Sequence, residues 1–314
     1  MSQRSYPTRA KPLPGGPRRP WHQTDAAFGW LLLAPTLLLL VAVSLYPVVR
    51  ILQLTFYRWN YARSESPEGF VGLRNWERLL SDETFWGSLK TTVVFLGIAL
   101  PIELAIGLGL ALLLNREIRG RGLARALLLP MMMSPVVIAL VWKMMYAVPY
   151  GPLNALLKGA GLIEQDLLWL ASPGLAMTSI VVATVWQWYP FAFLIFSAGL
   201  QTIPKEEYEA AAIDGAGPWA LLRHLIIPHL ASFLLIILLS RLLDGFKTFA
   251  IVYNLTGGGP GDATNLISFH VYRTAFASFN LGYGSTLAVA LMIVMLAFAG
   301  VVLWMTRRAG GRSE

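Results

Sequence analysis

Six apolar runs of about 20 residues each limit what this chain can fold into. A helix rises about 1.5 Å per residue, so a run of this length crosses the roughly 30 Å hydrocarbon core of a bilayer. The runs cover residues 28–49, 91–114, 124–147, 175–200, 230–254 and 285–305. The sequence therefore predicts an all-α, polytopic integral membrane protein with six transmembrane helices.

The apolar runs divide the chain into one membrane domain and two polar tails. The domain covers residues 28–305, between an N-terminal tail at 1–27 and a C-terminal tail at 306–314. Residues 42–44 resemble a signal-peptide cleavage site, but the first apolar run is longer than the roughly 7–15 residues of a signal-peptide core. We therefore expect this run to remain as a span. The even number of spans then places both termini on one side of the membrane.

The distribution of charge predicts which side the termini face. The net charge is +8, although only 13% of the residues are charged, about half the usual share in a globular domain. With both termini in the cytoplasm, the cytoplasmic segments hold more Lys and Arg than acids, whereas the outer segments hold equal numbers. Cytoplasmic loops of membrane proteins carry such an excess. The basic charge therefore indicates topology, and no nucleic-acid partner is needed to explain it.

Catalytic and metal-binding patterns are absent from the sequence. The chain has no cysteine, and its four histidines are not spaced as metal ligands. The glycine-rich segment 256–261 is not followed by the Gly-Lys-Ser/Thr of a phosphate-binding loop. We therefore expect no enzyme activity, no metal site and no bound cofactor in this chain. In particular, we do not expect it to hydrolyse ATP.

The cytoplasmic segment 201–229 has the pattern of two short helices joined by a turn. Pro204 suits the first position of a helix, and the two acids that follow it complement the positive end of the helix dipole. Gly215 suits a left-handed turn after the helix, and a second helix starts at Pro218 and ends near Pro228. From these residues alone, the segment is either an ordinary loop or a docking element.

A resemblance to a known signature lies in the same segment. Glu209-Ala210-Ala211, Gly215 and the residues up to Pro228 resemble the EAA signature, E-A-A-x3-G-x9-I-x-L-P, of permease subunits of binding-protein-dependent ABC importers. Two positions depart from it conservatively, with leucine and isoleucine exchanged before the proline. The string from Tyr208 to Ala216 resembles the carbohydrate-uptake branch, the maltose, trehalose and glycerol-3-phosphate type. Further segments similar to that branch are 115–122, 150–154, 255–261 and 272–276, within a likeness over residues 28–305.

The resemblance implies a fold, a function and a set of partners. The fold would be that of a type I ABC importer permease in a bacterial or archaeal cytoplasmic membrane. The chain would form half of the translocation pathway of an ATP-driven sugar importer. Its partners would be a second homologous permease, two ATPase subunits that carry ATP and Mg²⁺, and an extracytoplasmic sugar-binding protein. The residues implied to couple to the ATPase are Tyr208, Glu209, Ala210, Ala211, Asp214, Gly215 and Pro228.

Candidate substrate-pathway residues lie in the fourth span. Gln187, Trp188 and Tyr189 precede Pro190, which removes a backbone hydrogen bond and can kink a helix at membrane depth. Aromatic rings pack against the apolar faces of sugars, while amide and hydroxyl groups pair with sugar hydroxyls. Aromatic packing against lipid or neighbouring helices is the alternative interpretation.

The fifth span carries charges that a bilayer disfavours. Each costs roughly 2.5–3.5 kcal/mol at the bilayer centre, so these side chains should find partners. Arg241 and Asp244 are spaced i,i+3, as are Asp244 and Lys247, so each two can form an ion pair along the helix. Glu103 of the second span could neutralise the remaining positive charge. We expect a structural charge network, with direct substrate contact by Ser240, Arg241 and Asp244 as the second possibility.

An ion-coupled secondary transporter of a small polar solute is the alternative function. It would also use Glu103, Arg241 and Asp244 within the membrane. However, it would normally carry its whole pathway and would have no use for an EAA loop. A membrane-embedded hydrolase is a weaker alternative, because the sequence shows no pairing of a nucleophile with a base. Dependence of transport on ATP separates the first two possibilities.

Overall fold

The computed structural model describes residues 21–114 and 121–310. The chain forms two compact units, Met1–Arg50 and Ile51–Glu314, which we describe separately. The described part of the first unit is the first 30 residues of helix α1 (Trp21–Leu54), whose side chains from Phe28 onward are almost all exposed. A helix that is apolar on all sides is typical of a membrane span.

The number of long apolar helices agrees with the predicted architecture. Four helices of the described residues are long and apolar enough to cross a membrane: α1, α3 (Glu83–Leu114), α7 (Pro173–Leu200) and α14 (Leu281–Gly310). Two bent helix pairs raise this number to six if each pair forms one span. The all-α, polytopic fold class predicted from the sequence is therefore confirmed.

The predicted third span, residues 124–147, is not one straight helix. Helices α4 (Arg121–Met132) and α5 (Pro135–Met145) meet at an angle of 111°. Ser134 between them is extended, with φ −62° and ψ 139°. The residue before a proline avoids the helical region because the proline ring crowds its backbone, so Pro135 starts a new helix instead of continuing the old one.

The predicted fifth span, residues 230–254, is also interrupted. Helix α11 (Ala231–Phe246) ends before Lys247, and the separate short helix α12 (Ala250–Leu255) packs against α5. A hydropathy pattern cannot reveal this break, because apolar residues continue on both sides of it.

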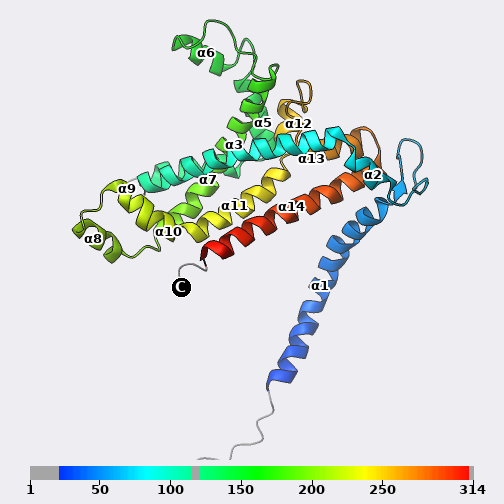
Figure 1. Ribbon diagram of the computed structural model, residues 1–314, viewed down its shortest axis with the longest axis horizontal. Helices are drawn as coiled ribbons and strands as arrows, with labels where there is room; N and C mark the ends of the chain where they lie inside the picture. Colours follow the sequence, from blue (N-terminus) through cyan, green and yellow to red (C-terminus); the bar gives the residue numbers. More distant parts are fainter. Residues whose placement is uncertain (1–20, 115–120, 311–314) are drawn as a thin grey trace, which may run out of the picture. The chain divides into compact units, whose positions relative to one another are not determined.

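Helices α3, α7, α11 and α14 run side by side in the second unit (Figure 1). Helix α3 packs closely on α7, where a Cβ added to Gly107 would lie 2.6 Å from the Cβ of Ala192. Two clusters of buried apolar side chains lie along these helices. The first includes Phe95, Ile180 and Phe246, and the second includes Phe196 and Ile237.

Short elements fill the polar stretches between the long helices. Strands β1 (Tyr57–Arg58) and β2 (Gly69–Phe70) form an antiparallel pair. The short helices outside the 201–229 segment are α2 (Arg74–Leu80), α6 (Pro152–Gly159), α13 (Ile267–Tyr272) and the π-helix η3 (Arg273–Ala277). The 201–229 segment itself contains α8 (Lys205–Ile213), α9 (Pro218–Leu221), the π-helix η2 (Leu222–Ile226) and α10 (Ile227–His229).

Candidate functional site

A cavity of about 420 Å³ lies between α7, α11 and the residues that follow α11. It gathers charged, polar and aromatic side chains from stretches far apart in the sequence. Its lining residues are Pro135, Thr184, Gln187, Trp188, Arg241, Asp244, Lys247, Thr248, Phe249, Ala250 and Ile251. Five of the residues that the sequence singled out therefore line one cavity.

The predicted partners among the charges lie in contact with one another. Arg241 donates two hydrogen bonds to Glu103, from Nε to Oε2 at 2.9 Å and from Nη2 to Oε1 at 3.1 Å, and both side chains are buried. Lys247 Nζ lies 3.1 Å from Asp244 Oδ1, and Arg241 Nη1 lies 4.0 Å from Asp244 Oδ2. In a bidentate pair of this kind, each buried charge is compensated by the other.

One face of the Trp188 ring contacts Arg241 of this charge network. The Arg241 guanidinium lies 4.2 Å from the centroid of the Trp188 ring, a cation–π contact. Arg241 is thus held by a carboxylate and by an aromatic face, both fixed on neighbouring helices. The Trp188 ring, which the sequence placed in the substrate pathway, lines the cavity while also anchoring the arginine.

Two buried oxygens beside the cavity have no hydrogen-bond partner among the described residues. They are Gln187 Oε1 and Thr184 Oγ1, one turn apart on α7. The other end of the Gln187 amide donates to the carbonyl oxygen of Met133 at 3.4 Å, at the break between α4 and α5. Buried polar groups are normally paired, so these two oxygens are exceptions beside the cavity, and both are covered by surrounding atoms in this conformation.

Tyr189 and Ser240, two other predicted pathway residues, are not among the residues that line the cavity. The Tyr189 hydroxyl instead donates to the carbonyl oxygen of Leu127 at 3.3 Å. Helix α7 continues through Pro190, so the kink considered from the sequence does not interrupt the helix.

Sequence reasoning missed Thr184, Thr248 and Phe249. Helical spacing from Gln187 points to Thr184, which lies three residues earlier on the same face. The other two residues depend on the break after α11, which no sequence pattern indicated.

The 201–229 segment forms the predicted helix, glycine turn and second helix. Gly215 has φ +72°, in the left-handed region that glycine adopts readily. Its N–H donates to the carbonyl oxygen of Ala212, and the N–H of Ala216 donates to that of Ala211, which together form a Schellman cap. Pro204 takes the N-cap position of α8 instead of the first helical position, so the helix begins one residue later than predicted.

Pro228 lies inside the second helical stretch, close to its end at His229. A proline has no N–H and its ring crowds the carbonyl four residues earlier. The preceding turn of helix, η2, has widened to a π-helix, which accommodates such an irregularity. A further contact missed by the sequence joins the two halves of the segment, where His229 Nε2 lies 3.2 Å from Glu207 Oε2.

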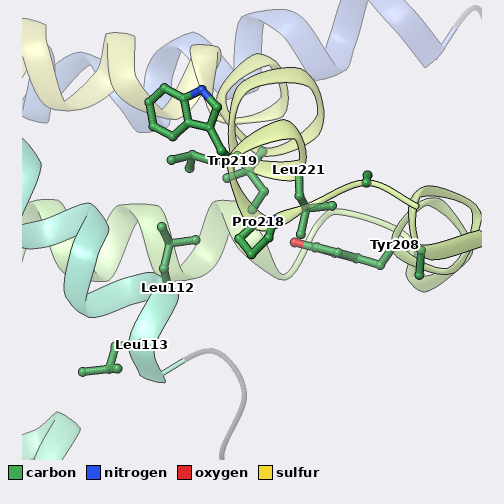
Figure 2. A pocket seen from close by; sticks show the side chains of 10 residues that line it. Leu112, Leu113, Tyr208, Pro218, Trp219 and Leu221 are labelled. Carbon is green, nitrogen blue, oxygen red and sulfur yellow. The ribbon is translucent and has the colours of Figure 1, made fainter. Parts of the chain in front are cut away.

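A groove of about 810 Å³ lies where this segment approaches the end of α3 (Figure 2). Its walls are mostly apolar and include Leu112, Tyr208, Pro218 and Leu221. The Tyr208 ring reaches from α8 toward Pro218 and Leu221 (Figure 2). Burial raises the pKa of the Tyr208 hydroxyl, and the nearby Glu207 carboxylate adds to this effect.

The residues predicted to face a partner differ in exposure. Glu209, Ala210, Asp214, Gly215 and Pro228 are exposed, whereas Ala211 is half-buried. Tyr208 is also half-buried, and its hydroxyl oxygen has no partner among the described residues. The segment therefore presents a mainly exposed surface, and its first helix, α8, ends in a Schellman cap.

Helices long enough to cross a membrane, with a charged and polar cavity between them, define the class of helical membrane transport proteins. Residues 103–310 match the family model described as "Binding-protein-dependent transport system inner membrane component", and the chain belongs to this family. The resemblance drawn from the EAA signature is thereby confirmed.

Curated relatives extend the match over most of the chain. The trehalose/maltose transport system permease protein MalF of Thermococcus litoralis is 37% identical, over 89% of this chain and 93% of the relative. The trehalose transport system permease protein SugA of Mycobacterium tuberculosis is 33% identical, over 91% of this chain and 92% of the relative.

A solved structure has the same fold. It is a bacterial ABC transporter involved in the import of the acidic polysaccharide alginate, which matches with a TM-score of 0.78. The alignment covers 91% of this chain and 98% of that chain at 21% identity. The architecture is therefore that of a type I ABC importer permease, as the resemblance implied.

Proposed function

We propose that this chain is the permease subunit of an ATP-driven sugar importer and forms half of its translocation pathway. The observation that carries the proposal is the cavity. Two buried oxygens without a protein partner among the described residues, those of Gln187 and Thr184, lie beside the rings of Trp188 and Phe249. The names of the trehalose/maltose and trehalose relatives support the substrate class.

The cavity has the mixed chemistry that a saccharide requires. Gln187 Oε1 and the half-exposed carboxylate of Asp244 accept hydrogen bonds from sugar hydroxyls, while aromatic rings pack against the apolar faces of the sugar. The Glu103–Arg241 pair is buried and already satisfied, so we assign it the structural role of holding α3 and α11 at a fixed spacing beside the cavity.

The 201–229 segment couples this cavity to a separate ATPase subunit. It follows α7 and precedes α11, the two helices that supply most of the polar cavity wall. The Schellman cap at Gly215 and the contact between His229 and Glu207 stiffen the segment. A rigid-body movement of the segment would therefore move both walls of the cavity. Glu209 and Ala210, which are exposed, face the partner in this proposal.

In this proposal, partner subunits supply the rest of the importer. A second homologous permease supplies the opposite wall of the pathway, and an extracytoplasmic sugar-binding protein delivers the substrate. Two ATPase subunits bind ATP and Mg²⁺ in this proposal, and ATP hydrolysis is assigned to them. The complex works by alternating access in the cytoplasmic membrane of a bacterium or archaeon, with both termini of this chain in the cytoplasm.

Uptake by the complete complex tests this function. Proteoliposomes that contain both permeases, the ATPases and the binding protein should accumulate labelled trehalose or maltose only when ATP is supplied to the ATPase side. The Gln187→Leu variant should reduce uptake by about tenfold, because it removes a buried hydrogen-bonding group. Tyr189→Phe, on the same helix but outside the cavity lining, is the matched control and should stay within about twofold of the wild type.

The ion-coupled alternative makes the opposite prediction. A proton or sodium gradient without ATP would then drive accumulation in the same proteoliposomes. Such a result would contradict the proposed function, whereas uptake that follows ATP and ignores ion gradients excludes the alternative.

A further inference from the structure

An aromatic ladder begins at the cavity. We define it as Phe249, Tyr253, Tyr272 and Phe276, which come from the residues after α11, from α12, from α13 and from η3. The ring centroid of Phe249 lies 5.3 Å from that of Tyr253 and 4.7 Å from that of Tyr272. Tyr253 and Tyr272 lie 5.5 Å apart, and Tyr272 stacks on Phe276 at 5.7 Å.

The exposure of the rings distinguishes this ladder from an ordinary aromatic core. Phe249 lines the cavity at one end, and Phe276 is 62% exposed at the other. Tyr253 is 49% exposed, and Tyr272 is partly exposed. Here a continuous series of accessible rings connects the cavity with the surface.

The structure holds the rings in place from behind. Phe269 is buried and contacts the ladder, and a Cβ added to Gly258 would lie 2.6 Å from its ring. The glycine-rich segment 256–261 therefore packs its backbone directly on Phe269. Ser268 Oγ donates to the carbonyl oxygen of Thr248 at 2.6 Å, which ties α13 to the residue before Phe249.

The outer end of the ladder is also fixed. Arg273 Nη1 lies 2.7 Å from Asp262 Oδ1, and this ion pair joins η3 to the loop that follows the glycine-rich segment. The rings are therefore arranged before any ligand arrives, which lowers the entropy cost of binding to them.

We propose that the aromatic ladder is an entry track for sugar rings, which leads from the outer surface to the cavity. The apolar face of a sugar ring stacks on an aromatic ring, while the hydroxyls at its rim stay hydrated. Each contact is weak and does not depend on the identity of the sugar, so a ring can pass from Phe276 to Tyr272 and on to Phe249. This inference rests on the proposed function and adds a route and a recognition chemistry to it.

Photocrosslinking tests the track in the complete complex. The photoreactive residue p-benzoylphenylalanine replaces Phe276, and tritiated trehalose or maltose is supplied on the binding protein during ATP turnover. Phe70, which is 70% exposed on β2 and lies outside the ladder, is the matched control position. We expect labelled sugar at position 276 and not at position 70. Equal labelling of both positions, or crosslinking of position 276 to the second permease instead of sugar, would overturn the proposal.

Transport rates separate the track from the proposed function. At a low concentration of sugar-loaded binding protein, Phe276→Leu should lower the rate of uptake by about three- to tenfold, because a stacking contact is lost. Phe276→Tyr keeps a ring and should retain uptake. If the wild type is active and Phe276→Leu also shows normal uptake, the track is contradicted while the proposed function still stands. A wild type that shows no ATP-driven uptake contradicts the proposed function and the track together.

Discussion

At the scale of single residues, the buried Glu103–Arg241 pair links two helices, α3 and α11. Its two hydrogen bonds and the cation–π contact with Trp188 join α3, α7 and α11. Breaking a buried pair by removing one partner costs about 3–5 kcal/mol, because the other charge is left uncompensated. Replacing both partners with apolar residues of similar volume removes that cost.

We therefore expect Glu103→Leu to lower the thermal stability of the purified complex strongly. The double variant Glu103→Leu/Arg241→Met should recover most of the loss, because no unpaired charge remains. Thermal unfolding in detergent measures both. A double variant as unstable as the single one would show that the pair does more than neutralise charge.

Gly215 supplies the turn of the 201–229 segment through its backbone alone. No atom lies within 4 Å of a Cβ added there, so a side chain meets no steric barrier except the strain of φ +72°. A β-branched residue held in the left-handed backbone region raises the free energy of the folded state by of order 1–3 kcal/mol, which is enough to change the turn.

We expect Gly215→Val to abolish sugar uptake and sugar-stimulated ATP hydrolysis while the complex still assembles. Gly217→Ala is the matched control, because Gly217 has φ −71° and open space around its Cβ. Uptake and ATP hydrolysis assays on purified complexes measure both variants. Full coupling in Gly215→Val would contradict the role assigned to the segment.

The sequence indicated the charged residues well and the aromatic ones less well. Glu103 and Arg241 were paired because a charge inside a span needs a partner, and the structure shows that contact. Tyr189 was chosen because it follows Gln187 and Trp188, but an α-helix turns by about 200° between Gln187 and Tyr189, so these two residues lie on opposite sides of α7. Ser240 also lies outside the cavity lining, although it is one helical turn from Asp244.

At the scale of elements, the packing of α3 on α7 depends on small residues. A Cβ on Gly107 would lie 2.8 Å from the backbone nitrogen of Phe193, which cannot move aside. Gly109, two residues further along α3, has open space where its Cβ would be.

Alanine substitutions at these two glycines should therefore have opposite effects. Gly107→Ala should destabilise the complex by about 1–3 kcal/mol, as expected for an overpacked interface. Gly109→Ala should be neutral or stabilising by up to about 1 kcal/mol, because glycine weakens a helix. Thermal unfolding compares them directly, and equal effects would mean that the α3–α7 crossing is looser than described.

A buried histidine joins the elements near the start of α3. His270 of α13 is buried, and its Nε2 lies 4.0 Å from Oδ2 of Asp82, which caps α3 through the N–H groups of Thr84 and Phe85. Burial is the largest influence and lowers the pKa of His270, and Arg273 adds to it. The carboxylates of Asp82 and Asp262 oppose this effect without reversing it.

This pKa shift predicts sensitivity to acid. The folded protein binds the His270 proton less readily than the unfolded chain, so stability is lost as pH falls through about 6.5 toward the lower folded pKa. His270→Phe should reduce the loss of thermal stability between about pH 7 and pH 5. An unchanged pH profile in this variant would show that other groups account for the acid sensitivity.

Element boundaries were only partly predictable. The apolar runs located the long helices, because length and hydropathy alone determine whether a segment can span a bilayer. The break at Ser134 could have been inferred from the proline that follows it. The break after α11 could not, since it has no proline and apolar residues continue beyond it.

At the scale of the whole molecule, the proposed function has the chain form a pathway only together with partners. The cavity wall described here comes from α7, α11 and the residues after α11, and the 201–229 segment connects these same helices. ATP binding by the partner subunits should therefore change the side from which the cavity is open.

Because the chain has no cysteine, a single introduced thiol reports the accessibility of one position. Thr248→Cys lies in the cavity lining, and Ala216→Cys in the exposed turn of the 201–229 segment is the control. An impermeant thiol reagent should reach Thr248→Cys from one side without nucleotide and from the opposite side when the ATPases are trapped with ATP. Ala216→Cys should react only from the cytoplasmic side in both states. Reaction of Thr248→Cys from the same side in both states would contradict the account.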